Sequence, residues 1–146
     1  MSLLRPTSYL LPLIGWKEDI GLPQLGHGKL VAKVDTGARS AALHAEDISV
    51  SGRRVHFTID LGGRRKACVA KLVDLKRIKS SNGMSEMRAL IETEIELGAH
   101  RFMTDITLTD RADMGVPMLL GREAIKGRFL VHAGKTFLLS RRKVMA

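Results

Sequence analysis

Short runs in which apolar and polar residues alternate, separated by glycine-containing turns, recur along most of the chain. From Val55 to Ile59 the alternation places Val55, Phe57 and Ile59 on one face of an extended segment. The 14 glycines, against 4 prolines, favour many tight turns between such segments. The pattern predicts an all-β fold, and 146 residues that are 45% hydrophobic suit a single domain with a real core.

The two ends of the chain lack this pattern. Residues 1–9 show no hydrophobic period, and residues 141–146 begin with Arg141-Arg142-Lys143. We therefore expect one domain over residues 10–140, between a flexible N-terminal tail and a basic, solvated C-terminal tail.

One extended segment, Leu30–Val34, runs into Asp35-Thr36-Gly37-Ala38. The glycine permits a tight turn in which no side chain crowds the backbone, and such a turn can hold a carboxylate at a strand end. Asp-Thr-Gly also marks ordinary turns, so a second signal is needed. That signal is the apolar strand Met118–Leu120, which leads into Gly121 and a short helix predicted over Arg122–Ile125.

Together, Asp35-Thr36-Gly37-Ala38 and the distant Leu119-Leu120-Gly121-Arg122 resemble the paired motifs of the retropepsin-like aspartic peptidases. More narrowly, Ser80-Ser81-Asn82-Gly83, Leu108–Arg111 and Pro117–Glu123 resemble a bacterial domain family labelled an ATP-dependent zinc protease and associated with glutamate-adding ATP-grasp ligases. The resemblance runs from Ile14 to Leu139. It implies a closed acid-protease-like barrel of about six to eight strands with one short helix after Gly121.

The resemblance also implies roles for individual residues. Asp35, Thr36 and Gly37 would be catalytic, and the strand residues Leu119, Leu120 and Gly121 would support their turn. Substrate would be bound by Ala38, Arg39, Ser81, Asn82, Gly83 and Arg122.

Asn82-Gly83 is a hairpin signal, because both residues tolerate positive φ. Lys76–Lys79 and Met87–Ile95 can pair around it. In a retropepsin-like enzyme this hairpin is the flap that closes over the peptide. The local sequence by itself supports a plain surface hairpin equally well.

Aspartic peptidases activate a water between two carboxylates that share one proton, whereas this chain contains Asp-Thr-Gly once. The resemblance therefore implies a symmetric homodimer in which Asp35 faces its own copy. The predicted function is an aspartic endopeptidase. The alternative is a catalytically inactive β-barrel that binds a ribosomal protein or a ligase partner.

The chain departs from the retroviral pattern directly after Ala38. Retroviral enzymes carry an acid there that pairs with the arginine after the downstream glycine, whereas this chain has Arg39. Either Arg122 pairs with another acid, Glu123 or Asp47, or two positive charges remain beside the cleft. Such charges would bind acidic side chains or a terminal carboxylate of a glutamate-rich substrate.

The formal net charge of +9 favours an acidic partner or substrate. Nucleic acid is disfavoured, because one Trp, one Tyr and four Phe offer little stacking surface and no nucleic-acid-binding motif is present. Gly26-His27-Gly28-Lys29 fails as a phosphate loop, because Leu30 stands where a serine or threonine would hold magnesium. We expect an acidic peptide or protein substrate and no cofactor.

The histidines do not fit the zinc label. None of them lies three or four residues from another: they are His27, His44, His56, His100 and His132. We predict no metal site, and we interpret His44 as a structural histidine. The single cysteine, Cys68, is expected in the core and suits a reducing compartment. No apolar stretch approaches the roughly 20 residues that span a bilayer, so we expect a cytoplasmic protein without membrane contact.

Overall fold

β-Strands make up most of the fold. The computed structural model describes residues 10–79 and 83–141, so the predicted tails, apart from Arg141, lie outside the described residues. The elements are β1 (Leu13–Gly15), β2 (Lys17–Leu22), η2 (Pro23–Leu25), β3 (His27–Val34), β4 (Ala41–His44), β5 (Glu46–Ser51), β6 (Arg54–Leu61), β7 (Arg64–Lys79), β8 (Ser85–Leu97), β9 (His100–Thr109), η3 (Ala112–Met114), β10 (Met118–Leu120), α1 (Arg122–Ile125) and β11 (Leu130–His132). Among the described residues, no helix has the length and apolar character needed to cross a membrane.

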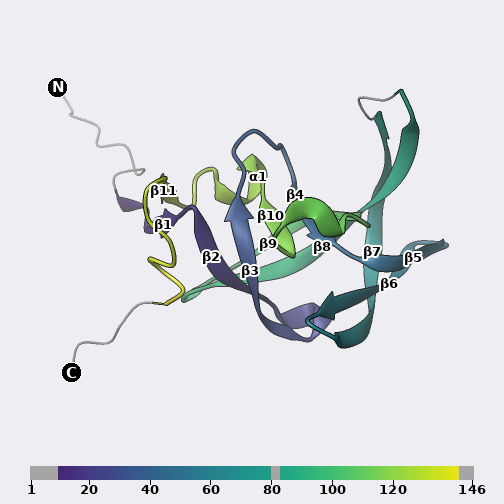
Figure 1. Ribbon diagram of the computed structural model, residues 1–146, viewed down its shortest axis with the longest axis horizontal. Coiled ribbons are helices and arrows are strands. Elements are labelled where there is room, and N and C mark those ends of the chain that lie inside the picture. Colours follow the sequence, from purple (N-terminus) through teal and green to yellow (C-terminus); the bar gives the residue numbers. More distant parts are fainter. Residues whose placement is uncertain (1–9, 80–82, 142–146) are drawn as a thin grey trace.

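Six of these strands close into a barrel in the order β2-β3-β10-β4-β9-β8 (Figure 1). The closure is made by β2 and β8, where Gly21 lies opposite Glu96. β10 runs parallel to β3 and antiparallel to β4, and β4 runs parallel to β9. The predicted all-β barrel, with its short helix directly after Gly121, is confirmed.

Alternate residues of the barrel strands fill its interior. Leu30 and Ala32 of β3 are buried, and so are Ile106 and Leu108 of β9. This inward row is the one that period-2 alternation predicts, because successive side chains of a strand point to opposite faces.

The long strand β7 joins the barrel to an arm made of β5, β6 and β7. Its first half pairs with β6 and its second half pairs with β8. Val55, Phe57 and Ile59 of β6 are buried on one face, which confirms the alternation read from the sequence. Cys68 of β7 packs with them as a buried thiol, as expected, and burial raises its pKa.

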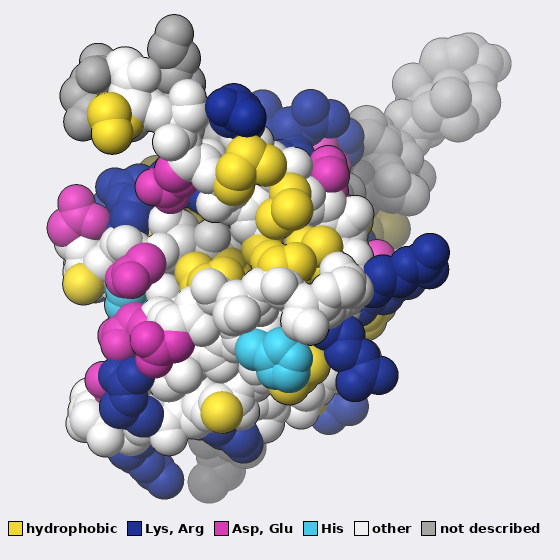
Figure 2. All heavy atoms as spheres, turned by 90° about the vertical axis from the view of Figure 1, so that its right-hand side faces the viewer, with side chains coloured by type: hydrophobic (Ala, Val, Ile, Leu, Met, Phe, Trp, Pro, Cys, Tyr) yellow, Lys and Arg dark blue, Asp and Glu magenta, His cyan; other side chains and the backbone are white. Residues whose placement is uncertain are grey.

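The opposite face of the arm is partly apolar. Val69, Val73 and Leu75 of β7 are each more than 40% exposed. Figure 2 looks onto this side of the molecule and shows hydrophobic side chains gathered in its middle, with charged side chains around them. The arm therefore presents an apolar outer surface in addition to the face that contributes to the core.

A buried carboxylate, Glu18 of β2, holds the C-terminal segment against the barrel. Glu18 is 0% exposed and accepts hydrogen bonds from the backbone N–H groups of Gly15 at 2.7 Å, Leu138 at 2.8 Å and Ser140 at 2.9 Å. It also accepts from the Leu139 N–H and from the Ser140 hydroxyl. Residues 138–140 thus direct their donors to one side chain instead of to a neighbouring strand.

These contacts set the ionisation of the carboxylates on β2. Burial raises the pKa of Glu18, but hydrogen bonds from Gly15, Ser140 and Leu138 outweigh it, and the net pKa is lowered. Hydrogen bonding to Arg141, followed by smaller charge effects, lowers the pKa of Asp19. Both groups are therefore ionised at neutral pH, and Arg141, the first residue of the predicted tail, is fixed to Asp19.

We expect Glu18→Gln to lower the free energy of unfolding by about 2–3 kcal/mol, because the amide NH₂ faces buried donors that the carboxylate oxygens satisfied. Urea unfolding of the full chain measures the change. Glu94→Gln is the matched control, because the Glu94 side chain makes no hydrogen bond or ion pair within residues 10–79 and 83–141.

The pH dependence of this difference is a second check on the same prediction. Because the folded-state pKa of Glu18 lies below its usual value of 4.5, its stabilisation is complete above that pH and is lost as the pH falls through the folded value. The gap between wild type and Glu18→Gln should shrink in that acid range. A gap of constant size would contradict a role for the ionised carboxylate.

Candidate active site

The turn that carries Asp35 begins where β3 ends. Val34 is the last residue of β3 to pair with β10, and the N–H of Asp35 donates to the carbonyl oxygen of Leu120 at 2.9 Å. The N–H of Ala38 donates to the carbonyl oxygen of Asp35 at 3.1 Å and closes a β-turn. Oδ1 of Asp35 accepts from the N–H of Gly37 at 3.1 Å. The half-buried carboxylate is therefore oriented by the backbone of its own turn.

The second sequence motif lies directly beside this turn. β10 is hydrogen-bonded on one edge to β3 and on the other to β4, and its Met118 and Leu120 side chains are buried. This position places Leu120 opposite Val34. The structure thus brings together the two motifs that the sequence separates, and the strand supports the turn that follows β3.

Arg122 fastens the turn to the start of α1. Its Nη1 donates to the carbonyl oxygens of Thr36 at 2.9 Å and Gly37 at 3.3 Å. Its backbone N–H donates to the carbonyl oxygen of Ala38 at 2.9 Å. A guanidinium suits this task, because its planar fork presents several donors in a fixed geometry. The side chain therefore acts as a clamp on the backbone of the turn.

Gly121 allows the two backbones to come close. A Cβ atom there would lie against the Ser40 carbonyl group, 2.5 Å from its carbon, and 3.0 Å from the carbonyl carbon of Arg39. The φ of Gly121 is −81°, a value that any residue adopts, so the requirement is for space. The Ser40 and Arg39 atoms that this Cβ would meet belong to the main chain, and they cannot rotate away as the end of a flexible side chain can.

Neither of the two acids considered as a partner of Arg122, Glu123 or Asp47, pairs with it; each faces another arginine. Glu123 faces Arg39, with 3.9 Å between Oε1 and Nε, and Asp47 pairs with Arg65 at 3.1 Å. The Arg39–Glu123 pair is long, and the Arg39 side chain is 78% exposed, so the pair contributes little to stability. Arg39 therefore stays available to a ligand, while Arg122 is engaged by backbone carbonyls.

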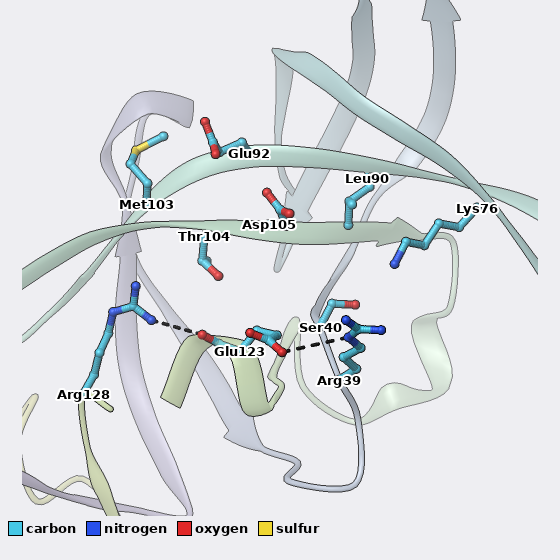
Figure 3. A pocket seen from close by; sticks show the side chains of 10 residues that line it. All are labelled: Arg39, Ser40, Lys76, Leu90, Glu92, Met103, Thr104, Asp105, Glu123 and Arg128. Carbon is cyan, nitrogen blue, oxygen red and sulfur yellow. Dashed lines mark hydrogen bonds and ion pairs between the residues drawn. The ribbon is translucent and has the colours of Figure 1, made fainter. Parts of the chain in front are cut away.

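A cavity of about 430 Å³ borders the turn on the side of Arg39 and Ser40 (Figure 3). The base of the β7–β8 hairpin forms one wall, β9 forms another, and Glu123 of α1 with Arg128 forms a third. Three basic and three acidic side chains face it: Arg39, Lys76, Arg128, Glu92, Asp105 and Glu123. Such a mixed lining can orient the backbone and charged side chains of a peptide.

Sequence reasoning missed most of this lining. Glu92 and Asp105 are directly opposite each other on β8 and β9, where like charges are unfavourable. The one available signal was Asp105, an acid within the strand that also carries Ile106 and Leu108. Lys76 and Arg128 gave no signal, because strand pairing and the α1 turn bring them to the cavity from distant parts of the chain.

The β7–β8 hairpin projects beyond the barrel (Figure 1). Its strands pair as far as Lys79 and Ser85, which agrees with the predicted hairpin. Gly83 has φ of 85°, the positive value expected there. Ser81 and Asn82 lie outside the described residues, so their assignment to substrate binding, like the flap role, stays a prediction.

The histidines and acids do not form a zinc site. Nδ1 of His44 accepts from the Arg111 N–H at 3.0 Å, as a structural histidine would, and Nδ1 of His132 accepts from the Gly134 N–H at 3.0 Å. Within the described part of the chain, no three His, Cys, Asp or Glu side chains are grouped so as to hold a metal ion. The residues present therefore do not fit the zinc that the family label implies.

A family model described as "Retropepsin-like aspartic endopeptidase RimB" matches residues 13–142. The closed barrel and its Asp-Thr-Gly turn thus define a retropepsin-like domain. The chain belongs to the RimB-like family.

The chain is also similar to longer proteins. It is 40% identical over 135 residues to a probable alpha-L-glutamate ligase of Shewanella pealeana, covering 87% of this chain and 30% of that protein. A relative with the same name from Desulfotalea psychrophila is 35% identical over 130 residues, covering 82% and 27%. The chain therefore spans less than a third of the length of these curated relatives.

A solved structure shares the fold. The crystal structure of the Legionella pneumophila protein Lpg0085, described as having unknown function, superposes with a TM-score of 0.72 and 28% sequence identity. The match covers 86% of this chain and 96% of that chain.

We expect Gly121→Ala to lower the free energy of unfolding by about 2 kcal/mol or more, because the added Cβ must push the Ser40 backbone away. Urea unfolding measures the change. Gly28→Ala is the matched control: a Cβ there meets no atom within 4 Å, so its effect should stay under about 1 kcal/mol. Similar losses in both variants would show that Gly121 is not required for close packing.

Proposed function

We propose that this chain is an aspartic endopeptidase that works as a homodimer, with one Asp35 from each copy in a shared site. The observation that carries the proposal is the placement of Asp35 at the end of β3, with its carboxylate oriented by Gly37 and its turn bonded to β10. Because Asp-Thr-Gly occurs once and the chemistry needs two carboxylates, a second copy completes the site.

In this mechanism the two Asp35 carboxylates share one proton and hold a water between them. The ionised carboxylate takes a proton from the water as its oxygen attacks the carbonyl carbon of the peptide, while the protonated carboxyl gives its proton to the carbonyl oxygen. The tetrahedral diol collapses as a proton passes to the amide nitrogen and the C–N bond breaks, which leaves a carboxylic acid and an amine. The pair titrates as a unit, so the two copies exchange roles.

Neighbouring residues have supporting parts in the proposal. Thr36 would bridge the two turns by hydrogen bonds across the twofold axis, and Gly37 would let substrate backbone approach. Ala38 keeps the turn small, and Arg122 holds it in place through its carbonyl groups. The β7–β8 hairpin would close over the peptide and exclude water.

The proposed substrate is an acidic, glutamate-rich peptide or protein. The net charge of +9 attracts such a chain, and the exposed Arg39 can pair with its carboxylates. The curated relatives are named glutamate ligases, which supports a substrate that carries added glutamate. Without cleavage, the same surfaces would serve a module that binds a ligase or a ribosomal protein.

We expect Asp35→Asn to reduce cleavage of a glutamate-rich peptide by about 10³-fold or more, because the amide can neither accept the proton of the water nor donate one to the carbonyl oxygen. Product formation followed by mass spectrometry measures the loss. Asp110→Asn, at an exposed position after β9, is the control and should keep its activity. No cleavage by wild type, together with binding of the peptide by both proteins, would favour the binding module.

A mixing experiment with the same variant tests whether two chains each contribute one Asp35 to a single site. A ninefold excess of Asp35→Asn chains over wild-type chains should lower activity per wild-type chain by about tenfold, because most wild-type chains then pair with a variant. Activity that follows the wild-type concentration alone would contradict the dimeric site.

We expect Arg39→Ala to slow cleavage of an oligoglutamate peptide by about tenfold and of a neutral peptide by less than about twofold, because the lost guanidinium would bind carboxylates of the substrate. The ratio of kcat/KM values for the two peptides is the measurement. Arg53→Ala removes an equal charge from the turn between β5 and β6 and should leave the ratio unchanged. Equal losses on both peptides would rule out charge recognition by Arg39.

A further inference from the structure

A second cavity lies at the other end of β3 from the Asp35 turn. Its volume is about 550 Å³, and its charged lining is entirely basic or imidazole: His27, Lys29, Arg64, Arg65 and Lys66. β3 begins at His27 and contains eight residues, so this basic pocket lies roughly 25 Å along the strand from Asp35. It is separate from the cavity beside the turn.

Two of these five groups carry little free charge, and a third, Lys29, has a carboxylate neighbour that it shares with Arg141. Lys29 faces Asp19 at 3.4 Å, and Arg65 bonds to the carboxylates of Glu46 and Asp47 and lies 3.4 Å from Asp60. Burial, and then the charge on Lys66, lowers the pKa of His27, so the ring is neutral at neutral pH. Arg64 and Lys66 are therefore the two cations of the basic pocket that face no carboxylate of the described residues.

Arg64 and Lys66 have no carboxylate partner among residues 10–79 and 83–141. Lys66 donates from Nζ to the carbonyl oxygen of Gly26 at 3.0 Å, and Arg64 makes no ion pair within these ranges. The two residues are alternate positions of β7, so their side chains leave the same face of the strand, roughly 7 Å apart. They form a pair of cations that no carboxylate of the described residues neutralises, and the strand fixes the spacing of their Cα atoms.

The Lys66 ammonium packs closely against the loop before β3. Gly26 has φ of 77°, and a Cβ there would collide with Nζ of Lys66 and come within 2.8 Å of its Cε. The turn between β6 and β7 lies beside this loop at the lower edge of Figure 1. The Lys66 ammonium thus lies against the backbone of Gly26, where it lines the pocket.

We propose that the basic pocket is an exosite that binds an acidic peptide segment through Arg64 and Lys66. In an extended chain, alternate residues point to one face with Cα atoms roughly 7 Å apart, which matches the Cα spacing of Arg64 and Lys66 on β7. A compact anion would instead need donors converging on one point. The proposal rests on the proposed function for the identity of its ligand as substrate, but binding itself does not require Asp35.

The test uses the full chain with Asp35→Asn, so that the peptide is bound and not cut. Isothermal titration with an octaglutamate peptide gives the affinity, and the amide NMR signals of Gly26 and Gly28 report whether the pocket is occupied. We expect Arg64→Gln with Lys66→Gln to weaken binding by about tenfold. In this variant octaglutamate should no longer shift the Gly26 and Gly28 signals. The affinity of the Asp35→Asn parent for octaglutamate should fall as salt rises.

The matched control is Arg54→Gln with Lys71→Gln. These residues are cross-strand partners on β6 and β7, lie outside the basic pocket, and give a variant of the same net charge. It should bind octaglutamate within about twofold of the parent. Equal weakening by both variants would show a general field effect and overturn the proposal.

Three further outcomes separate this proposal from its alternatives and from the proposed function. Polyphosphate binding at Gly26 and Gly28 without octaglutamate binding would overturn the peptide exosite. If octaglutamate binds there but wild type and Asp35→Asn are equally unable to cleave, the peptidase proposal fails and the exosite stands. If cleavage depends on Asp35 while the pocket variant binds and cleaves long and short acidic peptides normally, the exosite alone fails.

Discussion

The position of Asp35 depends on hydrogen bonds between two pieces of backbone. The turn after β3 is joined to the segment from Leu120 to Glu123 by main-chain bonds of 2.9–3.0 Å, and Arg122 adds side-chain bonds to two carbonyl groups of the turn. Little of this depends on side chains of the turn itself. The barrel contributes by holding β10 hydrogen-bonded to β3 and β4, so that a strand of three residues suffices to fix the loop.

This construction explains why the chain tolerates Arg39 where retroviral enzymes have an acid. Arg122 needs no carboxylate partner, because the carbonyl oxygens of Thr36 and Gly37 accept its hydrogen bonds. A guanidinium that is bonded to neutral oxygens keeps its positive charge uncompensated. Position 39 therefore has no structural task in this chain, and the exposed arginine there adds one of the three basic side chains that face the cavity. The departure from the family pattern alters charge near the site without loosening the turn.

Local physics made much of the fold predictable. Alternation identified the buried face of β6, and the Asn-Gly step marked the β7–β8 hairpin. The support of the Asp35 turn by Leu119–Gly121 was implied by the family resemblance and not by local sequence. Contacts between distant segments were not predictable in this way. Nothing near Glu18 shows that its carboxylate will accept hydrogen bonds from residues 138–140, and Lys76 reaches the cavity because of strand pairing far from the turn. Such roles follow from how distant segments pack and pair in the folded chain, which a single sequence does not display.

Under these proposals, the Asp35 site at one end of β3 depends on a second copy of the chain, whereas the basic pocket at the other end does not. The Asp35 turn is held within one chain, so its geometry is ready before a partner arrives, and completing the dyad would depend on how two chains dock. Peptide binding by Arg64 and Lys66 involves one chain only and would not vary with dimerisation. When one end of a long peptide is bound at the basic pocket, its other end stays near the Asp35 turn, about 25 Å away, and its effective concentration there is raised. A long acidic chain would therefore gain from both regions, whereas a short one could occupy only one of them at a time.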